Sequence, residues 1–277
     1  MAARTVFALA LVAAACTGYG DDGGSGPPGA VLRVIYGIDT ANTLIRFSNT
    51  APGSITRSVT VTGLKTGERV LGIDFRVADG KLYGVGDSSR LYTIDTTSGA
   101  ATAVNAAAFT PALVGTAFGF GLNPVADLLR VHSDSDQNLR IDPATGAVVG
   151  IDTPIGWDTS DVNAGTLATI AGTAYTNSVS PTPATTVLYA IETNLDLLVI
   201  VAIPNAGRLV TVGNLGVSTT GNVGFDIVGS DGTAYVTLTP PTGGASRLHF
   251  VNLTTGVATL VGVVGGGAVL RGIAVAP

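Results

Sequence analysis

The feature that most constrains this chain is a repeat in which four short apolar segments follow one another between turns. Each copy opens on an apolar segment that contains a glycine, and these glycines are Gly72, Gly119, Gly165, Gly224 and Gly272. They are 47, 46, 59 and 48 residues apart. Alternating apolar residues between Asp-Gly and Thr-Gly turns predict antiparallel strands. Four strands in a repeat of about 40 to 50 residues are typical of a β-propeller blade.

Four copies are complete, and the two ends of the chain supply the fifth. The complete copies cover residues 72–105, 119–152, 165–202 and 224–262. The incomplete ones are three strand-like segments at 31–38, 43–48 and 55–61 and one opening segment at 271–275. We therefore predict an all-β fold, a five-bladed β-propeller over residues 31–277 that is closed by a C-terminal strand joining three N-terminal strands. A β-sandwich or an open array of hairpins is the alternative.

The composition agrees with strands and limits the possible chemistry. With 38 Gly, 13 Pro and glutamate only at positions 68 and 192, residues that favour helices are scarce. The chain has 14 Lys and Arg against 19 Asp and Glu, which argues against a nucleic-acid partner. His132, His249 and the single Cys16 are too few for a His-rich zinc site or a disulfide within the chain. Both histidines alternate within apolar segments, so we expect them to be structural.

The first 30 residues are typical of an export signal followed by a tether. Arg4 precedes an apolar run at 6–15 that is too short to cross a bilayer as a helix. The run ends in Leu-Val-Ala-Ala-Ala-Cys, which resembles a bacterial lipobox, so we predict a signal peptide at 1–15 and lipidation of Cys16. Residues 16–30 are rich in Gly, Ser, Asp and Pro and predict a flexible tether. Ordinary secretory cleavage, with Cys16 incidental, is the alternative.

Several motifs resemble those of a bacterial family, domain of unknown function 4394. They are Gly-Ile-Asp-Phe-Arg at 72–76, Arg-Leu-Tyr-Thr-Ile-Asp at 90–95, Gly-Phe-Gly-Leu-Asn-Pro at 119–124, Pro-Asn-Ala-Gly at 204–207 and Gly-Phe-Asp-Ile at 224–227. The resemblance covers about residues 31–277. It implies an exported propeller with no agreed activity, and it supplies no catalytic residue.

Two acids occupy equivalent places in the repeat. Asp74 and Asp226 lie in opening segments, and the corresponding strands of a propeller line its central channel. Two channel-lining carboxylates can hold a cation or act as an acid and base pair. The structural alternative is that each accepts backbone hydrogen bonds from a neighbouring blade.

A second group of polar residues lies in the longer loops and is predicted to bind ligand. Asp134, Asp136 and Asn138 are spaced like the start of a calcium loop, but the glycine and the distal glutamate of that loop are missing. A solvated turn is the alternative. Trp157, the only tryptophan, lies in a connector with Asp158 and Asp161, as aromatic residues that hold sugars or flat ligands often do. The alternative is that Trp157 fills the core.

Loop lengths predict which face binds. The loops after each second strand and the connectors between blades emerge on one side, and this side is expected to carry the long segments 134–138, 152–164, 178–185 and 204–222. The opposite side carries short repeated turns.

These observations favour a non-catalytic propeller that binds a ligand or partner at the bacterial cell surface. The expected partner is an extracellular polymer or another protein, with the membrane reached only through the lipid anchor, and the expected state is a monomer. No cofactor is expected, although calcium is possible at the 134–138 loop. Outer-membrane or cell-surface attachment is expected, with a periplasmic or secreted protein as the alternative. The alternative function is a hydrolase or lyase that acts on extracellular polysaccharide through the channel carboxylates.

Overall fold

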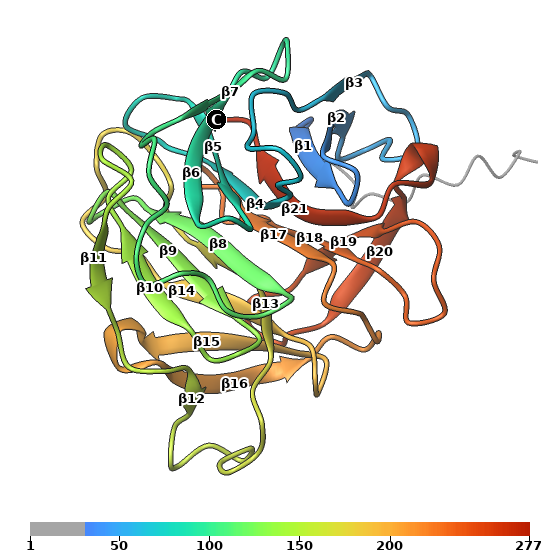
Figure 1. The fold of residues 1–277 in the computed structure, drawn as a ribbon. Coiled ribbons are helices and arrows are strands. Elements are labelled where there is room, and N and C mark those ends of the chain that lie inside the picture. Colours follow the sequence, from blue (N-terminus) through green and yellow to red (C-terminus); the bar gives the residue numbers. More distant parts are fainter. Residues whose placement is uncertain (1–30) are drawn as a thin grey trace, which may run out of the picture.

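The computed structural model describes residues 31–277, which form five mainly antiparallel sheets around a central axis (Figure 1). Blade 1 consists of β4 (Val70–Phe75), β5 (Leu82–Gly86), β6 (Arg90–Ile94) and β7 (Ala101–Ala103). Blade 2 consists of β8 (Phe118–Asn123), β9 (Leu128–Ser133), β10 (Asn138–Ile141) and β11 (Val148–Ile151). The predicted five-bladed propeller is confirmed.

Blade 3 has a fifth strand, β12, which pairs in parallel with β16. Its strands are β12 (Gly156–Trp157), β13 (Ile170–Tyr175), β14 (Leu188–Glu192), β15 (Leu197–Ile203) and β16 (Arg208–Asn214). Blade 4 consists of β17 (Val223–Ile227), β18 (Ala234–Leu238), β19 (Arg247–Val251) and β20 (Ala258–Val263). The closing blade consists of β21 (Leu270–Val275), β1 (Val34–Asp39), β2 (Thr43–Ser48) and β3 (Arg57–Thr60).

The closing blade joins the two ends of the described chain, as the sequence predicts. β21 is its inner strand and pairs with β1 from Ile35 opposite Val275 to Asp39 opposite Leu270. Backbone hydrogen bonds extend this pairing at both ends, from Thr40 N to Val269 O and from Ala276 N to Val34 O. The last strand of the chain therefore completes a sheet begun by the first three.

The strand order of blade 3 differs from the prediction by one strand. Gly165 lies in the connector with a φ of +83°, and the inner strand is β13, which contains Gly172. The segment 188–192 resembles the third strand of blade 1, since its Leu-Tyr-Ala-Ile-Glu matches Leu-Tyr-Thr-Ile-Asp at 91–95, but it forms the second strand of blade 3, β14. The fourth strand β16 lies within 204–222, where a connector was predicted. The error arose because the second and third strands of a blade share the same apolar pattern.

The five inner strands pack so closely that the channel is closed at its middle. A Cβ on Gly224 of β17 would lie 2.6 Å from Ile273 N of β21, so only glycine fits there. The cavity between the inner strands at this level is only about 10 Å³. A ligand can therefore reach the channel residues only from one of its two ends.

The two faces of the propeller carry different loops. We call the side with the second-to-third-strand loops and the interblade connectors the connector face, and the opposite side the turn face. The loop 176–187, which contains the predicted segment 178–185, joins β13 to β14 and so belongs to the turn face, contrary to the prediction. The short 3₁₀ helix Pro204–Ala206 joins β15 to β16. Among residues 31–277, no helix is long and apolar enough to span a membrane.

Candidate functional site

The mouth of the central channel on the turn face holds a cavity of about 290 Å³. Asp74 of β4 and Asp226 of β17 both line it, as the sequence predicts for channel residues. β4 and β17 pack against β21. Apolar side chains, including Phe75, Val228 and Val275, form most of the remaining wall. The cavity is thus a small apolar chamber with two carboxylates.

Acids at this level occur in only two of the five inner strands. In the sequence register of the opening glycines, Asp74 and Asp226 correspond to Gly121, Ala174 and Ala274 in the other blades. The carboxylates are therefore specific to blades 1 and 4, which flank the closing blade, and are not a general requirement of a blade.

Each carboxylate accepts hydrogen bonds from the backbone of the next blade. Asp74 Oδ2 accepts from Leu122 N of β8 at 2.7 Å. Asp226 Oδ2 accepts from Val275 N of β21 at 2.6 Å, and its Oδ1 accepts from Ile227 N at 2.7 Å. The structural alternative is thus correct for these oxygens. Asp226 has both oxygens engaged, whereas Asp74 makes one such bond.

Within residues 31–277, no Arg, Lys or His forms an ion pair with either carboxylate. Arg33 lines the same cavity, but its guanidinium pairs with Asp231 at 2.6 Å. Burial raises the pKa of Asp226 to about 6. Burial first, and then the charge of Asp226, raises the pKa of Asp74 well above its ordinary range. Both carboxyls therefore favour the protonated form more than an exposed aspartate does, and a cation bound beside them would favour the ionised form.

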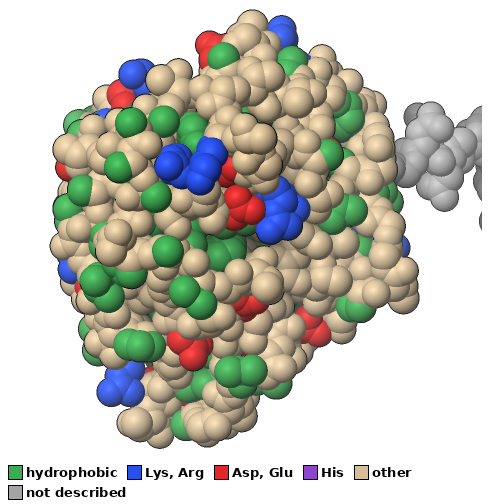
Figure 2. Space-filling model, viewed as in Figure 1, with side chains coloured by type: hydrophobic (Ala, Val, Ile, Leu, Met, Phe, Trp, Pro, Cys, Tyr) green, Lys and Arg blue, Asp and Glu red, His purple; other side chains and the backbone are tan. Residues whose placement is uncertain are grey.

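A smaller cavity of about 110 Å³ adjoins the channel mouth and shares Val77, Val179 and Ser180 with it. Arg76 lines this cavity and pairs with Asp127 of blade 2 and with Asp79 at 3.0 Å. The pair with Asp127 links blades 1 and 2 at the turn face, and the pair with Asp79 lies within the turn between β4 and β5. Figure 2 likewise shows basic and acidic side chains lying next to each other near the middle of the face it displays.

The first three residues of the loop group support local structure. Asp134 accepts from Thr116 N at 2.8 Å and Oγ1 at 2.5 Å. Asn138 is buried, and its Oδ1 accepts from Arg130 while its Nδ2 donates to Pro204 O. Asp136 has a φ of +61° and lies in the turn. Among residues 31–277, no group of three acids, histidines or cysteines has the geometry of a metal site.

The other three residues of that group do not form an exposed site either. Trp157 is only 7% exposed and packs with the core residues Ile155 and Leu209, so it fills the core. Asp158 accepts from Ser160 and Asp161 accepts from Thr211 N at 2.7 Å. The structure does not gather the six loop residues around one of the cavities described here, and their binding role stays a prediction.

The histidines are structural, as expected. His132 is fully buried, with its Nδ1 3.2 Å from Thr173 Oγ1 of the neighbouring blade. Burial lowers the pKa of His132 to about 3. His249 is also buried, and its Nδ1 lies 2.9 Å from Arg247 O. Neither ring faces a cavity described here.

Similar solved structures share little sequence with this chain. Glutaminyl cyclase of Myxococcus xanthus is 15% identical with a TM-score of 0.44, over 76% of this chain and 83% of that one. Hydrazine synthase of Kuenenia stuttgartiensis is 13% identical with a TM-score of 0.43, over 73% of this chain but only about half (52%) of that one. The extracellular domain of a proposed one-component system from B. thetaiotaomicron is 14% identical with a TM-score of 0.37, over 86% and 29%.

No curated protein matches the chain. A family model does match, over residues 43–274, and this region includes all four complete blades and most of the closing blade. The matched region contains Asp74 and Asp226 but not Arg33. The chain belongs to the family described as Domain of unknown function (DUF4394).

Proposed function

We propose that this propeller is exported, anchored to the membrane through Cys16, and binds a small organic cation at the channel mouth without chemical conversion. The observation that carries the proposal is the pair Asp74 and Asp226 in a cavity of about 290 Å³. Among the described residues, no Arg, Lys or His forms an ion pair with either carboxylate. Carboxylates buried without a counterion are costly, and a bound cation removes that cost. Apolar walls suit the hydrocarbon part of such a ligand.

The binding step is tested by calorimetric titration with butylammonium, and with butanol as the neutral probe of matched shape. We expect butylammonium to bind at pH 8 and butanol to bind at least tenfold more weakly. Asp74→Asn should weaken butylammonium binding at least tenfold, whereas Asp142→Asn, in the turn between β10 and β11, should not. Equal binding of both probes, or binding unchanged by Asp74→Asn, would refute the proposal.

The anchor is tested separately in cells. Cys16 follows a segment that resembles a signal peptide and precedes a tether-like segment, both outside the described residues. We expect labelled palmitate to be incorporated into the wild type and not into Cys16→Ser, which should be released from the membrane fraction. If the wild-type protein is unlabelled and wholly soluble, the predicted lipid anchor is wrong. The predicted cation binding would not be affected by that result, because the titration tests it separately.

A second function is favoured by the two carboxylates that line one cavity, both with a raised pKa. A protonated and an ionised carboxyl in one cavity can serve as an acid and a base in hydrolysis or elimination. Incubation with extracellular polysaccharides distinguishes the two functions, since only a hydrolase or lyase releases new reducing ends or unsaturated products, and only if Asp74 and Asp226 are intact.

A further inference from the structure

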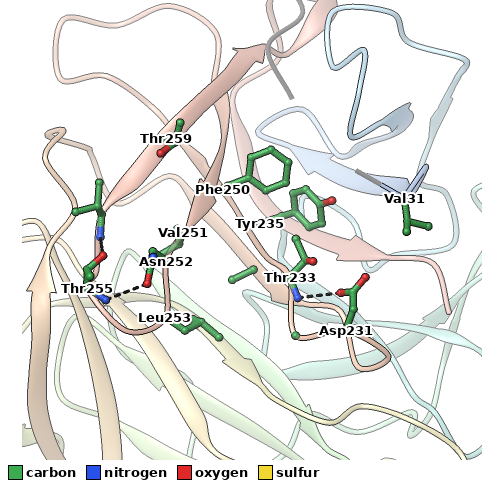
Figure 3. Close-up of a pocket in the computed structure, with 13 residues that line it drawn as sticks. Val31, Asp231, Thr233, Tyr235, Phe250, Val251, Asn252, Leu253, Thr255 and Thr259 are labelled. Atoms are coloured by element: carbon green, nitrogen blue, oxygen red, sulfur yellow. Dashed lines mark hydrogen bonds between the residues drawn. The ribbon is translucent and has the colours of Figure 1, made fainter. Parts of the chain in front are cut away.

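We infer that a groove on blade 4 binds a neutral saccharide ring. The groove has a volume of about 810 Å³ and lies along the turn-face edge of β18 and β19 (Figure 3). Ligand sites commonly enclose 300 to 1,000 Å³. This site lies outside the channel mouth, so the inference does not depend on the cation site proposed above.

Two aromatic rings form the apolar part of the groove. Tyr235 of β18 lies directly across from Phe250 of β19, with ring centroids 5.0 Å apart and planes inclined by 43°. The Tyr235 ring is buried, and its hydroxyl accepts a hydrogen bond of 2.7 Å from Asn49 Nδ2. The Phe250 ring is half-buried, and Figure 3 shows it beside Tyr235 in the groove. Tyr235 thus holds Phe250 in place, and Phe250 presents an apolar surface.

Polar groups with free hydrogen-bonding capacity surround this surface. Asn252 uses its Oδ1 to accept from Thr254 N and Thr255 N. Within residues 31–277, no hydrogen bond uses Asn252 Nδ2 or the Thr259 hydroxyl. An amide donor and a hydroxyl beside an aromatic ring match a sugar, which has an apolar C–H face and hydroxyl groups around its edge.

The single charge in the lining of the groove is neutralised from outside it. Asp231 is the only charged side chain among the lining residues, and Arg33, which lies outside the lining, pairs with it at 2.6 Å. Neither a cationic nor an anionic ligand is therefore favoured, which points to a neutral sugar.

Blade 1 provides an internal comparison for the groove. A cavity of about 380 Å³ lies at the same place in that blade. There Thr93 lies opposite Tyr83 and Thr102, as Phe250 lies opposite Tyr235 and Thr259. The blade 1 cavity also has two charged residues, Lys81 and Asp95, where the groove has Thr233 and Asn252. The blade 4 groove thus differs from the blade 1 cavity in its larger volume, in the ring of Phe250 and in having Thr233 and Asn252 in place of the two charged residues.

The comparison also gives the test variant. Phe250→Thr installs the residue that blade 1 carries at the same position, so the sheet is expected to accept it. Phe250→Tyr keeps the ring. Thr93→Ala is the matched control in blade 1.

The experiment measures binding by saturation-transfer NMR and calorimetry. The probes are cellohexaose, maltohexaose, laminarihexaose and chitohexaose as neutral oligosaccharides, with an oligogalacturonate as the anionic one. We expect at least one neutral probe to bind the wild type, Phe250→Thr to weaken it at least tenfold, and Phe250→Tyr and Thr93→Ala to stay within about twofold. Asp74→Asn should leave saccharide binding unchanged, which separates this site from the channel mouth.

Three results would overturn the inference. They are no binding of the neutral probes to the wild type, unchanged binding by a folded Phe250→Thr protein, and stronger binding of oligogalacturonate than of every neutral probe.

Discussion

Neutralising Asp74 should stabilise the propeller at high pH, although this residue makes a native hydrogen bond. Both channel carboxylates have a raised pKa in the folded protein, so the fold favours their protonated forms. Such a group contributes stability that is complete below its unfolded pKa and lost as the pH rises through its folded pKa. For Asp226, a pKa of about 6 in place of 3.8 corresponds to about 3 kcal/mol in all, most of which is lost between pH 4 and pH 7.

The two aspartates should respond differently to substitution by asparagine. In Asp74→Asn the amide oxygen can still accept from Leu122 N, while the repulsion with Asp226 disappears. In Asp226→Asn one of two backbone donors, Ile227 N or Val275 N, must face an amide NH₂. That mismatch costs about 1–3 kcal/mol and offsets the loss of the charge.

Thermal unfolding of the ligand-free protein at pH 4, 6 and 8 measures this difference. We expect Asp74→Asn to have a higher Tm than the wild type at pH 8, and each kcal/mol gained corresponds to about 2 to 4 °C in Tm for a domain of this size. At pH 4 the two proteins should have the same Tm, and Asp226→Asn should gain nothing at pH 8. A Tm of Asp74→Asn at or below that of the wild type at pH 8 would refute the reasoning, as would an equal gain at pH 4.

Two further predictions concern closure of the propeller and the buried His132. Deleting residues 269–277 removes β21, which pairs with β1 and packs against β4 and β17. This deletion should abolish the cooperative unfolding transition seen by circular dichroism, and an unchanged transition would contradict closure by this strand. Because the pKa of His132 is lowered to about 3, this residue destabilises the fold as the pH falls from about 6.5. His132→Phe should therefore lose less stability than the wild type between pH 7 and pH 4 in urea titrations, and an equal loss would show that His132 is not the cause.

The repeat predicted the architecture because each inner strand packs closely against the inner strands of the neighbouring blades. A glycine such as Gly72 or Gly272 recurs where neighbouring backbones approach closely, and its spacing reveals the number of blades. The prediction failed in blade 3, where Leu-Tyr-Ala-Ile-Glu at 188–192 resembles Leu-Tyr-Thr-Ile-Asp at 91–95. One segment is a second strand and the other a third strand, and both are largely buried, so their patterns do not distinguish them.

The channel carboxylates could be predicted for the same reason, since equivalent positions of the repeat lie at the same distance from the propeller axis. Trp157 could not, because the sequence does not show that its connector adds the strand β12 to the edge of blade 3. The blade 4 groove was also missed. Its lining includes Val31, from the chain that leads into the closing blade, and no local pattern around Phe250 encodes that contact.

Both proposed sites lie beside the closing blade, and this has a consequence for stability. Asp74 and Asp226 lie on the two inner strands that pack against β21, and Asp226 accepts from the β21 backbone. Arg33, just before β1, lines the channel mouth and pairs with Asp231, which lines the groove. A ligand at the channel mouth therefore contacts β4, β17 and β21, and β21 is the strand that closes the propeller. Since a ligand bound only to the folded state stabilises it by about 2.7 kcal/mol at 100 times its Kd, occupancy of the mouth should strengthen closure directly.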